Sequence, residues 1–199
     1  VREAAVDIAS RVRRRIEARG RRLAPAGVTW VKADNLHLTL RFLGETDPKQ
    51  TERIEAGLGQ AGRRSRPFSL CIGRTGCFPN FRQPNVLWLG VDGDLALLAE
   101  LQRSIEGLVQ SAGFEAEARA FSPHLTLARA RRERPRAELR AAGALLEAEA
   151  GAASQGDGPG RPFSEQPVCF TVAEVVHMRS DLRPAGPIYT PLSVHLLGD

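Results

Sequence analysis

Lysine is almost absent from this chain, because only Lys32 and Lys49 occur among its 28 basic residues. The formal net charge of +5 and the pI near 9.8 therefore come from arginine. The planar fork of arginine can donate two parallel hydrogen bonds to a phosphate, so a nucleotide or nucleic-acid partner is permitted. A genomic composition bias explains the same excess equally well, and both readings stay open.

Cysteine is scarce as well. Cys71, Cys77 and Cys169 are odd in number and form no Cys-x-x-Cys pair. This pattern disfavours a disulfide framework and a zinc knuckle, and we expect all three to be packing residues.

Long apolar runs are also missing, and the first residues lack the unbroken apolar centre of a secretory signal. We therefore expect a soluble, cytoplasmic protein without membrane contact. With 199 residues, 42% of them hydrophobic, the chain can form one domain of two packed lobes.

The hydrophobic periodicity predicts a mixture of helices and strands. Helices are expected before Gly20, after Asp47-Pro48 with Gln50, over 95–112 with a stop at Gly113, and over 135–149. Strands are expected over 28–32, 36–43, 68–72, 86–91, 121–128, 168–178 and 188–197. Residues 76–80 read as a turn, and the Gly- and Ser-rich residues 151–161 read as a flexible loop. The order indicates an α+β fold of two similar lobes.

The word His-Leu-Thr-Leu occurs twice, starting at His37 and at His124, and uses two of only four histidines. Side chains alternate along a strand, so each histidine would share a face with Thr39 or Thr126 while the leucines face the core. Two imidazoles can act as acid and base on opposite sides of a phosphorus atom, and two hydroxyls can donate to its non-bridging oxygens. This chemistry needs no metal or cofactor.

The flanking residues strengthen this interpretation. The segments at 35–44, 86–91 and 121–129, together with the closing stretch from Ser180 through Gly186 to Tyr189, resemble the 2H phosphoesterase superfamily and its RNA 2′,3′-cyclic phosphodiesterase branch, historically called 2′-5′ RNA ligases. The resemblance implies one domain over 1–199 with two pseudo-symmetric lobes, each an antiparallel sheet with flanking helices, around a central cleft. It also implies hydrolysis of RNA 2′,3′-cyclic phosphate ends, tRNA fragments included, to 2′-phosphomonoesters by a monomer.

By the same resemblance, His37 is the proton donor and His124 the proton acceptor, although near symmetry lets these roles exchange. Arg129 matches a basic residue that follows the second motif of the family and would bind phosphate. Strict alternation places Arg129 on the face opposite His124, so this role requires a bend or bulge after Leu127. Arg41 shares the parity of His37 and is a second candidate for substrate binding.

Alternative interpretations remain for several residues. Thr39 and Thr126 could be simple strand formers, and His177 and His195 are expected to be structural or on the surface. Phe42 and Tyr189 could stack on a base, but the parity of Phe42 favours the core. The arginines at 129, 131, 132, 134 and 136 could follow an RNA backbone or lie in solvent. Ligation as the main activity and a non-catalytic nucleotide-binding module are the competing functions.

Overall fold

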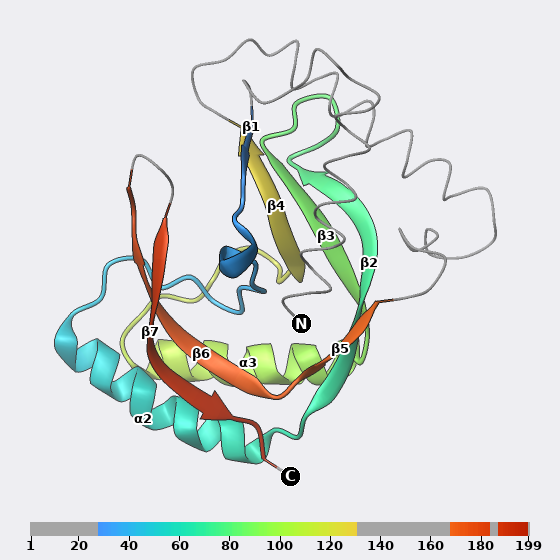
Figure 1. The fold of residues 1–199 in the computed structure, drawn as a ribbon. Helices are drawn as coiled ribbons and strands as arrows, with labels where there is room; N and C mark the ends of the chain where they lie inside the picture. Colours follow the sequence, from blue (N-terminus) through green and yellow to red (C-terminus); the bar gives the residue numbers. More distant parts are fainter. Residues whose placement is uncertain (1–27, 131–167, 184–186, 199) are drawn as a thin grey trace. The chain divides into compact units, whose positions relative to one another are not determined.

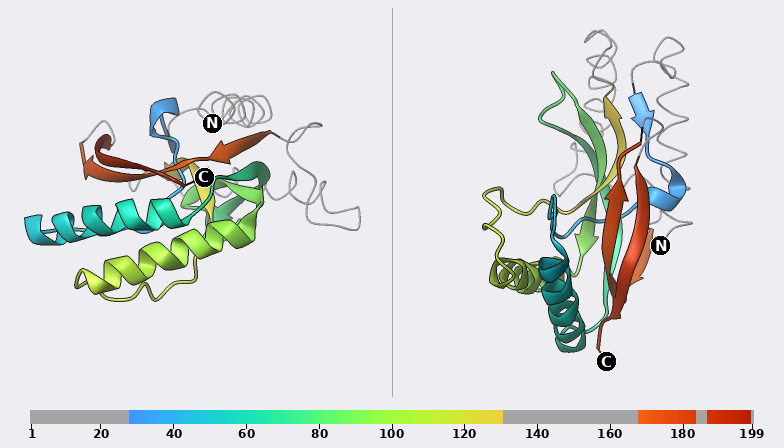
Figure 2. Two further views of the ribbon diagram at one scale, coloured as in Figure 1. Left: turned by 90° about the horizontal axis from the view of Figure 1, so that it is seen from below. Right: turned by 90° about the vertical axis from the view of Figure 1, so that its left-hand side faces the viewer.

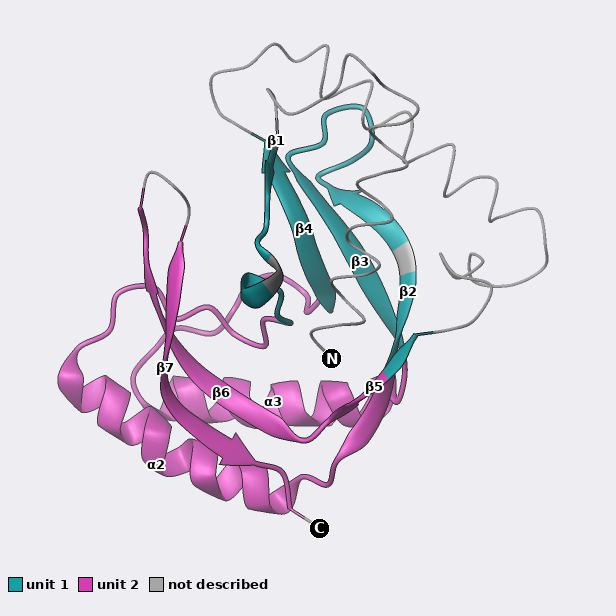
Figure 3. Ribbon diagram, viewed as in Figure 1, with its two compact units in different colours: residues 1–38, 71–92, 123–169 teal, residues 39–70, 93–122, 170–199 magenta. Residues whose placement is uncertain are grey.

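The computed structural model describes residues 28–130, 168–183 and 187–198. The chain divides into two compact units (Figure 3). Unit 1 comprises Val1–Leu38, Cys71–Asp92 and Pro123–Cys169, and unit 2 comprises Thr39–Leu70, Gly93–Ser122 and Phe170–Asp199. Each unit is assembled from three separate segments, so neither is a simple half of the sequence.

A five-stranded sheet has the order β1-β4-β3-β2-β5 (Figure 1), and β1, β4 and most of β2 and β3 belong to unit 1. Its strands are β1 Val28–Trp30, β2 Phe68–Phe78, β3 Val86–Gly93, β4 His124–Ala130 and β5 Cys169–Val172. β4 is antiparallel to both of its neighbours, β1 and β3. β3 lies in the middle of the sheet, as its continuous apolar sequence predicted, and Leu87, Leu89 and Val91 are buried.

Unit 2 combines the helices α2 Pro48–Arg64 and α3 Leu95–Ser111 with the two-stranded antiparallel sheet of β6 Glu174–Asp181 and β7 Ile188–Leu196. α2 contacts α3 on one side and both strands on another (Figures 1 and 2). The strand pairs β1–β4, β3–β4 and β6–β7 are antiparallel, and no helix connects parallel strands among these pairs. This arrangement confirms the predicted α+β class.

The start of α2 follows the sequence prediction closely. The Asp47 side chain accepts a hydrogen bond from the backbone N–H of Gln50, and the Gln50 side chain accepts one from the backbone N–H of Asp47. This capping box, with Pro48 in the first turn, satisfies amide groups that would otherwise lack partners. One face of α2 then buries Ile54 and Leu58 in unit 2.

The helix α3 also follows its predicted pattern. Leu98, Leu101, Ile105 and Val109 are buried along one face. Gly113 has φ +99°, a left-handed conformation that glycine adopts easily, and it ends the helix where expected. Among the described residues, no helix is both long enough and apolar enough to cross a membrane.

The expected strand over 36–43 is wrong. A short 3-10 helix, η1 Ala33–Asn35, precedes this segment, and its only β contact in the described chain is an isolated antiparallel bridge from Leu38 to Leu125. Antiparallel pairing beyond His124 would meet Pro123, which has no amide hydrogen to donate. The first motif is therefore extended chain rather than a regular strand. The predicted turn over 76–80 is also partly wrong, because β2 continues through Phe78.

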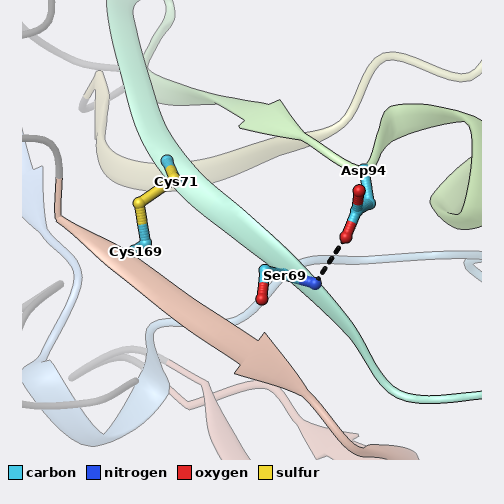
Figure 4. The surroundings of a disulfide bond; sticks show 4 residues. All are labelled: Ser69, Cys71, Asp94 and Cys169. Carbon is cyan, nitrogen blue, oxygen red and sulfur yellow. Dashed lines mark hydrogen bonds between the residues drawn. A yellow bond between two sulfur atoms is a disulfide. The ribbon is translucent and has the colours of Figure 1, made fainter.

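The cysteine expectation is wrong for two of the three residues. Cys71 and Cys169 form a disulfide with a Cα–Cα distance of 3.9 Å (Figure 4). They lie on β2 and β5, which are neighbours in the sheet, and the Ile72 N–H donates to the Val168 carbonyl beside them. The error has a simple cause: 98 residues separate the two cysteines, and sequence spacing does not reveal which strands become neighbours. Cys77 is outside this disulfide and buried, as a packing residue should be.

Another polar contact fixes the chain near this disulfide. The Ser69 N–H donates to Asp94 Oδ2 at 2.9 Å (Figure 4), and the Asp94 N–H donates to the Ser69 carbonyl. The first expected helix, the helix over 135–149 and the loop over 151–161 lie outside the described residues.

Candidate functional site

The two copies of His-Leu-Thr-Leu contact each other through their first leucines, which both belong to unit 1. Leu38 of the first copy bridges Leu125 of the second, so the same position of each copy is paired. Leu125 is 3% exposed, which places this pair on the core side. Because adjacent residues alternate faces, His37 belongs on the opposite, more accessible face, together with His124 and Thr126. Their exposure agrees, because His37 is exposed and the other two are half-buried.

Arg129 reaches the same face through a bulge in β4. Along β3, Val86, Trp88 and Gly90 alternate on one face without interruption, and they pair with Arg129, Thr126 and His124 respectively. The register shifts between Trp88 and Leu87, because Leu127 is an extra residue in β4 between Thr126 and Ala128.

The burial of β4 supports this register. Leu125, Leu127 and Ala128 are all buried, so strict alternation is broken at Leu127, whereas Arg129 is exposed. The bulge that the phosphate-binding role of Arg129 required is thus present at the expected place. The other arginines of this cluster, at 131, 132, 134 and 136, lie outside the described residues.

The ring of His37 is oriented by the backbone that precedes it. Its Nδ1 lies 2.7 Å from the carbonyl oxygen of Asn35, at the end of η1. A carbonyl can only accept, so Nδ1 carries the hydrogen in this contact, and Nε2 is the ring atom that can gain or lose a proton. No sequence signal indicated that Asn35 would contribute its backbone here.

His124 is held in a group of aromatic rings. Its ring centroid lies 5.0 Å from that of Phe78 with an edge-on angle of 80°, and 6.2 Å from that of Trp88. Phe78 and Trp88 also contact each other at 5.2 Å. Gly76 makes room for this arrangement, because a Cβ there would overlap the Trp88 indole. Trp88 lies in a segment that resembles the family, but its contact with His124 depends on the β3–β4 register, which the sequence did not define.

Thr39 and Arg41 belong to unit 2. Thr39 is exposed and directly follows Leu38. Arg41 is 11% exposed and lies against acceptors of its own unit: Nε is 3.1 Å from Glu106, one terminal nitrogen is 3.1 Å from Glu117, and the other donates to the Glu115 carbonyl at 2.6 Å. The Glu106 contact has ion-pair distance without hydrogen-bond geometry. These contacts favour a structural role for Arg41 over the expected contact with substrate.

The carboxylates around Arg41 are stabilised in their charged form. Hydrogen bonds from the Arg119 side chain and backbone, with a smaller contribution from Arg41, lower the pKa of Glu117 to about 2. The pKa of Glu106 is lowered mainly by a hydrogen bond from Gln110, then by one from the Glu117 N–H.

The remaining sequence candidates lie apart from these contacts. His177 is buried with Nδ1 3.5 Å from Glu55, and the His195 ring contacts the Ser193 hydroxyl at 2.9 Å, both as expected of structural histidines in unit 2. Phe42 is 70% exposed, so the expectation that it packs in the core is wrong. Tyr189 is half-buried in β7. Among the described residues, no three His, Cys, Asp or Glu side chains are grouped as metal ligands would be.

Comparison with known sequences identifies similar proteins. The family described as LigT like Phosphoesterase matches residues 5–88. An RNA 2′,3′-cyclic phosphodiesterase of Methanothermobacter thermautotrophicus is 36% identical over 175 residues, covering 87% of this chain and 85% of that protein. One of Archaeoglobus fulgidus is 34% identical over 134 residues, covering 66% and 73%.

Comparison with solved structures finds proteins of similar fold. TT0787 of Thermus thermophilus has a TM-score of 0.67 with 25% identity, covering 97% of this chain and 93% of that one. LigT of E. coli in complex with 3′-AMP has a TM-score of 0.62 with 26% identity, covering 95% and 92%.

Proposed function

The chain belongs to the LigT-like phosphoesterases of the 2H superfamily, and from this premise we propose that it opens 2′,3′-cyclic phosphates at RNA ends to give 2′-phosphomonoesters. The relatives of Methanothermobacter and Archaeoglobus carry the name of this activity. The proposed reaction uses two histidines as acid and base and no metal ion.

One observation carries the proposal. The antiparallel bridge between Leu38 and Leu125 sets the two motif copies side by side in unit 1. By alternation of side chains, His37 and His124 then share the accessible face opposite the two leucines. Thr126 lies on that face by alternation, and Arg129 joins it through the bulge at Leu127. Two imidazoles, a hydroxyl and a guanidinium are the groups that a phosphodiester hydrolase without a metal would use.

In the proposed step, the His124 imidazole accepts a proton from water while the water oxygen attacks phosphorus. The bond from phosphorus to the 3′ oxygen breaks, and the leaving oxygen takes a proton from His37 Nε2. An imidazolium donates from both ring nitrogens, and His37 already has the Asn35 carbonyl as acceptor for Nδ1. This contact leaves Nε2 to exchange the proton in either role, and the assignment of His37 as the acid follows the family resemblance.

The hydroxyls and the guanidinium would act on the phosphate itself. Thr39 and Thr126 donate to the non-bridging oxygens, where negative charge accumulates as water adds. Arg129 binds the same phosphate through its fork of N–H groups. The proposed substrate is RNA with a 2′,3′-cyclic phosphate end, tRNA fragments included, and the protein would act as a cytoplasmic monomer.

A bilobal arrangement of two pseudo-symmetric lobes around a central cleft remains part of the proposal. The antiparallel bridge of Leu38 with Leu125 relates the two copies by a local two-fold axis, as any antiparallel pair is related, and is compatible with this arrangement.

Product mapping tests this function. An oligonucleotide ending in a 2′,3′-cyclic phosphate is incubated with the protein in excess EDTA, and the products are separated as 2′- and 3′-phosphates. We expect the 2′-phosphate at an undiminished rate in EDTA. A 3′-phosphate product, loss of activity in EDTA, or binding without turnover would contradict the proposal. RNA joined through a 2′-5′ bond, measured with two RNA halves in the same assay, would reveal ligation.

A further inference from the structure

Arg41 holds together three parts of unit 2 that are distant in sequence. It lies two residues after Thr39, whereas Glu106 is on α3 and Glu115 and Glu117 are in the segment that follows this helix. All three guanidinium nitrogens lie within 3.1 Å of an acceptor in these parts. The chain that leaves the first motif is therefore attached to the helix end and to the segment that leads to the second motif.

The acceptors are themselves fixed. Glu117 receives two parallel hydrogen bonds of 3.1 Å from the Arg119 side chain, and its backbone N–H donates to Glu106 Oε1 at 3.0 Å. Glu106 extends from α3, where Ile105 and Val109 are buried. A guanidinium that binds acceptors of this kind has little rotational freedom, because each contact restricts a different direction.

The exposure of Arg41 argues against direct contact with a substrate. Its side chain is 11% exposed, and its nitrogens face Glu106, Glu117 and the Glu115 carbonyl. A phosphate would have to displace two carboxylates to reach the guanidinium, and it would then lie beside their negative charges. Arg129, which is exposed, has no such conflict.

We propose that Arg41 is a positioning residue that fixes the Thr39 hydroxyl for the phosphate by anchoring the chain after the first motif to Glu106 and to the segment of Glu115 and Glu117. This inference rests on the proposed function, since it assigns Arg41 a part in that reaction. Arg41 is specific for this task because its fork reaches three acceptors at once, whereas a lysine ammonium is a single point of charge.

A double-mutant cycle between Arg41 and Thr39 tests the inference. Thr39→Val removes the hydroxyl and should lower kcat about 100-fold, as the loss of one transition-state donor does. Arg41→Met should lower kcat about 10-fold or more with KM within about twofold, because a misplaced hydroxyl affects the transition state more than binding. Combining both changes should cost little more than Thr39→Val alone, because Arg41 acts through this hydroxyl.

Arg103→Met is the matched control. Arg103 lies on α3, as Glu106 does, but it is exposed and is not one of the contacts of Arg41. The change should leave kcat within about twofold, since surface substitutions away from such contacts have small effects. Arg41→Lys keeps the charge without the fork and should recover only part of kcat. If Arg41→Met does not fold, the cycle with Thr39→Val is measured with Arg41→Lys.

Three results would overturn the inference. The first is a wild-type kcat in the Arg41 variants. The second is a double variant whose loss of kcat equals the product of the two single losses. The third is an Arg41 variant in which KM changes and kcat does not. If Arg41 had a purely structural role, its substitution would lower the melting temperature, and its loss of kcat would multiply with the loss caused by Thr39→Val. The proposed function is judged separately by turnover of the wild-type protein, so its failure is distinguishable from failure of the Arg41 cycle in an active enzyme.

Discussion

Leu38 and Leu125, which occupy the same position in the two copies of His-Leu-Thr-Leu, face each other in an antiparallel bridge. The two copies of the repeated sequence are therefore also neighbours in the structure. The bridging leucines lie on the core side, and the histidine before each of them lies on the other face. Because the two histidines occupy equivalent positions, we expect turnover to need both of them.

His37→Ala and His124→Ala should each lower kcat by about 10²- to 10⁴-fold, the usual contribution of a positioned acid or base. Turnover of a cyclic-phosphate oligonucleotide measures this, and the wild-type rate should fall on both the acidic and the alkaline side of an optimum, because one imidazole must be protonated and the other neutral. His195→Asn is the control, since His195 contacts Ser193 in unit 2. Full activity in either alanine variant would contradict two-histidine catalysis.

Arg129→Ala should raise KM about 10-fold, because an exposed guanidinium on the face of His124 and Thr126 would bind the phosphate of the bound substrate. Arg129→Lys should recover part of the loss, since it keeps the charge but not the fork. Arg82→Ala is a matched control at an exposed position in the turn after β2. Initial rates over a range of substrate concentrations separate KM from kcat, and an unchanged KM in Arg129→Ala would reject this role.

Gly76→Ala should destabilise the protein by about 1–3 kcal/mol, because the added methyl group would overlap the Trp88 indole and overpack unit 1. Gly107→Ala is the matched control on α3, where a Cβ meets nothing within 4 Å. It should stabilise by about 0.5–1 kcal/mol through helix propensity.

Urea unfolding measures both glycine variants. Gly76→Ala should also lower kcat, since Trp88 and Phe78 hold the ring of His124. Equal stability of the two variants would show that Trp88 does not need the space over Gly76.

Local signals predicted the parts of the fold that local chemistry determines. The capping box involves Asp47 and Gln50, which are three positions apart, and the end of α3 depends on the single residue Gly113. For Arg129, side-chain parity alone required a bulge after Leu127, and β4 has its bulge at Leu127.

The errors and the unforeseen contacts concern pairing between distant segments. The disulfide of Cys71 with Cys169 depends on β2 and β5 becoming neighbours. The contacts of Arg41 depend on Glu106 and Glu117, which are more than 60 residues away. Parity assigned Arg41 to the face of His37, but alternation of side chains ends where regular strand ends, and within the described part of the chain the first motif has a single bridge.

Acid should destabilise unit 2 through Glu117. Its pKa in the folded protein is about 2, mainly because Arg119 donates to it, whereas the ordinary value is 4.5. A lowered pKa contributes stability above the ordinary value, and that stability is lost as the pH falls from 4.5 towards 2.

Glu117→Gln should therefore flatten the dependence of the unfolding free energy on pH in this window. Glu115→Gln is the control, because Glu115 offers its backbone carbonyl to Arg41. Urea unfolding at several pH values measures both variants. An equal slope in wild type and Glu117→Gln would contradict the lowered pKa.

Breaking the bond between Cys71 and Cys169 should destabilise the protein by about 2–4 kcal/mol, because the bond closes a loop between cysteines 98 positions apart and restricts the unfolded chain. The double variant Cys71→Ser with Cys169→Ser should melt at a lower temperature than the oxidised wild type and should be insensitive to dithiothreitol. The wild type should melt lower once dithiothreitol is present. Cys77→Ala is the control, since Cys77 is not part of the disulfide and this variant should keep the response to reductant. Labelling of three thiols in the unfolded wild type without reductant would show that the disulfide is absent.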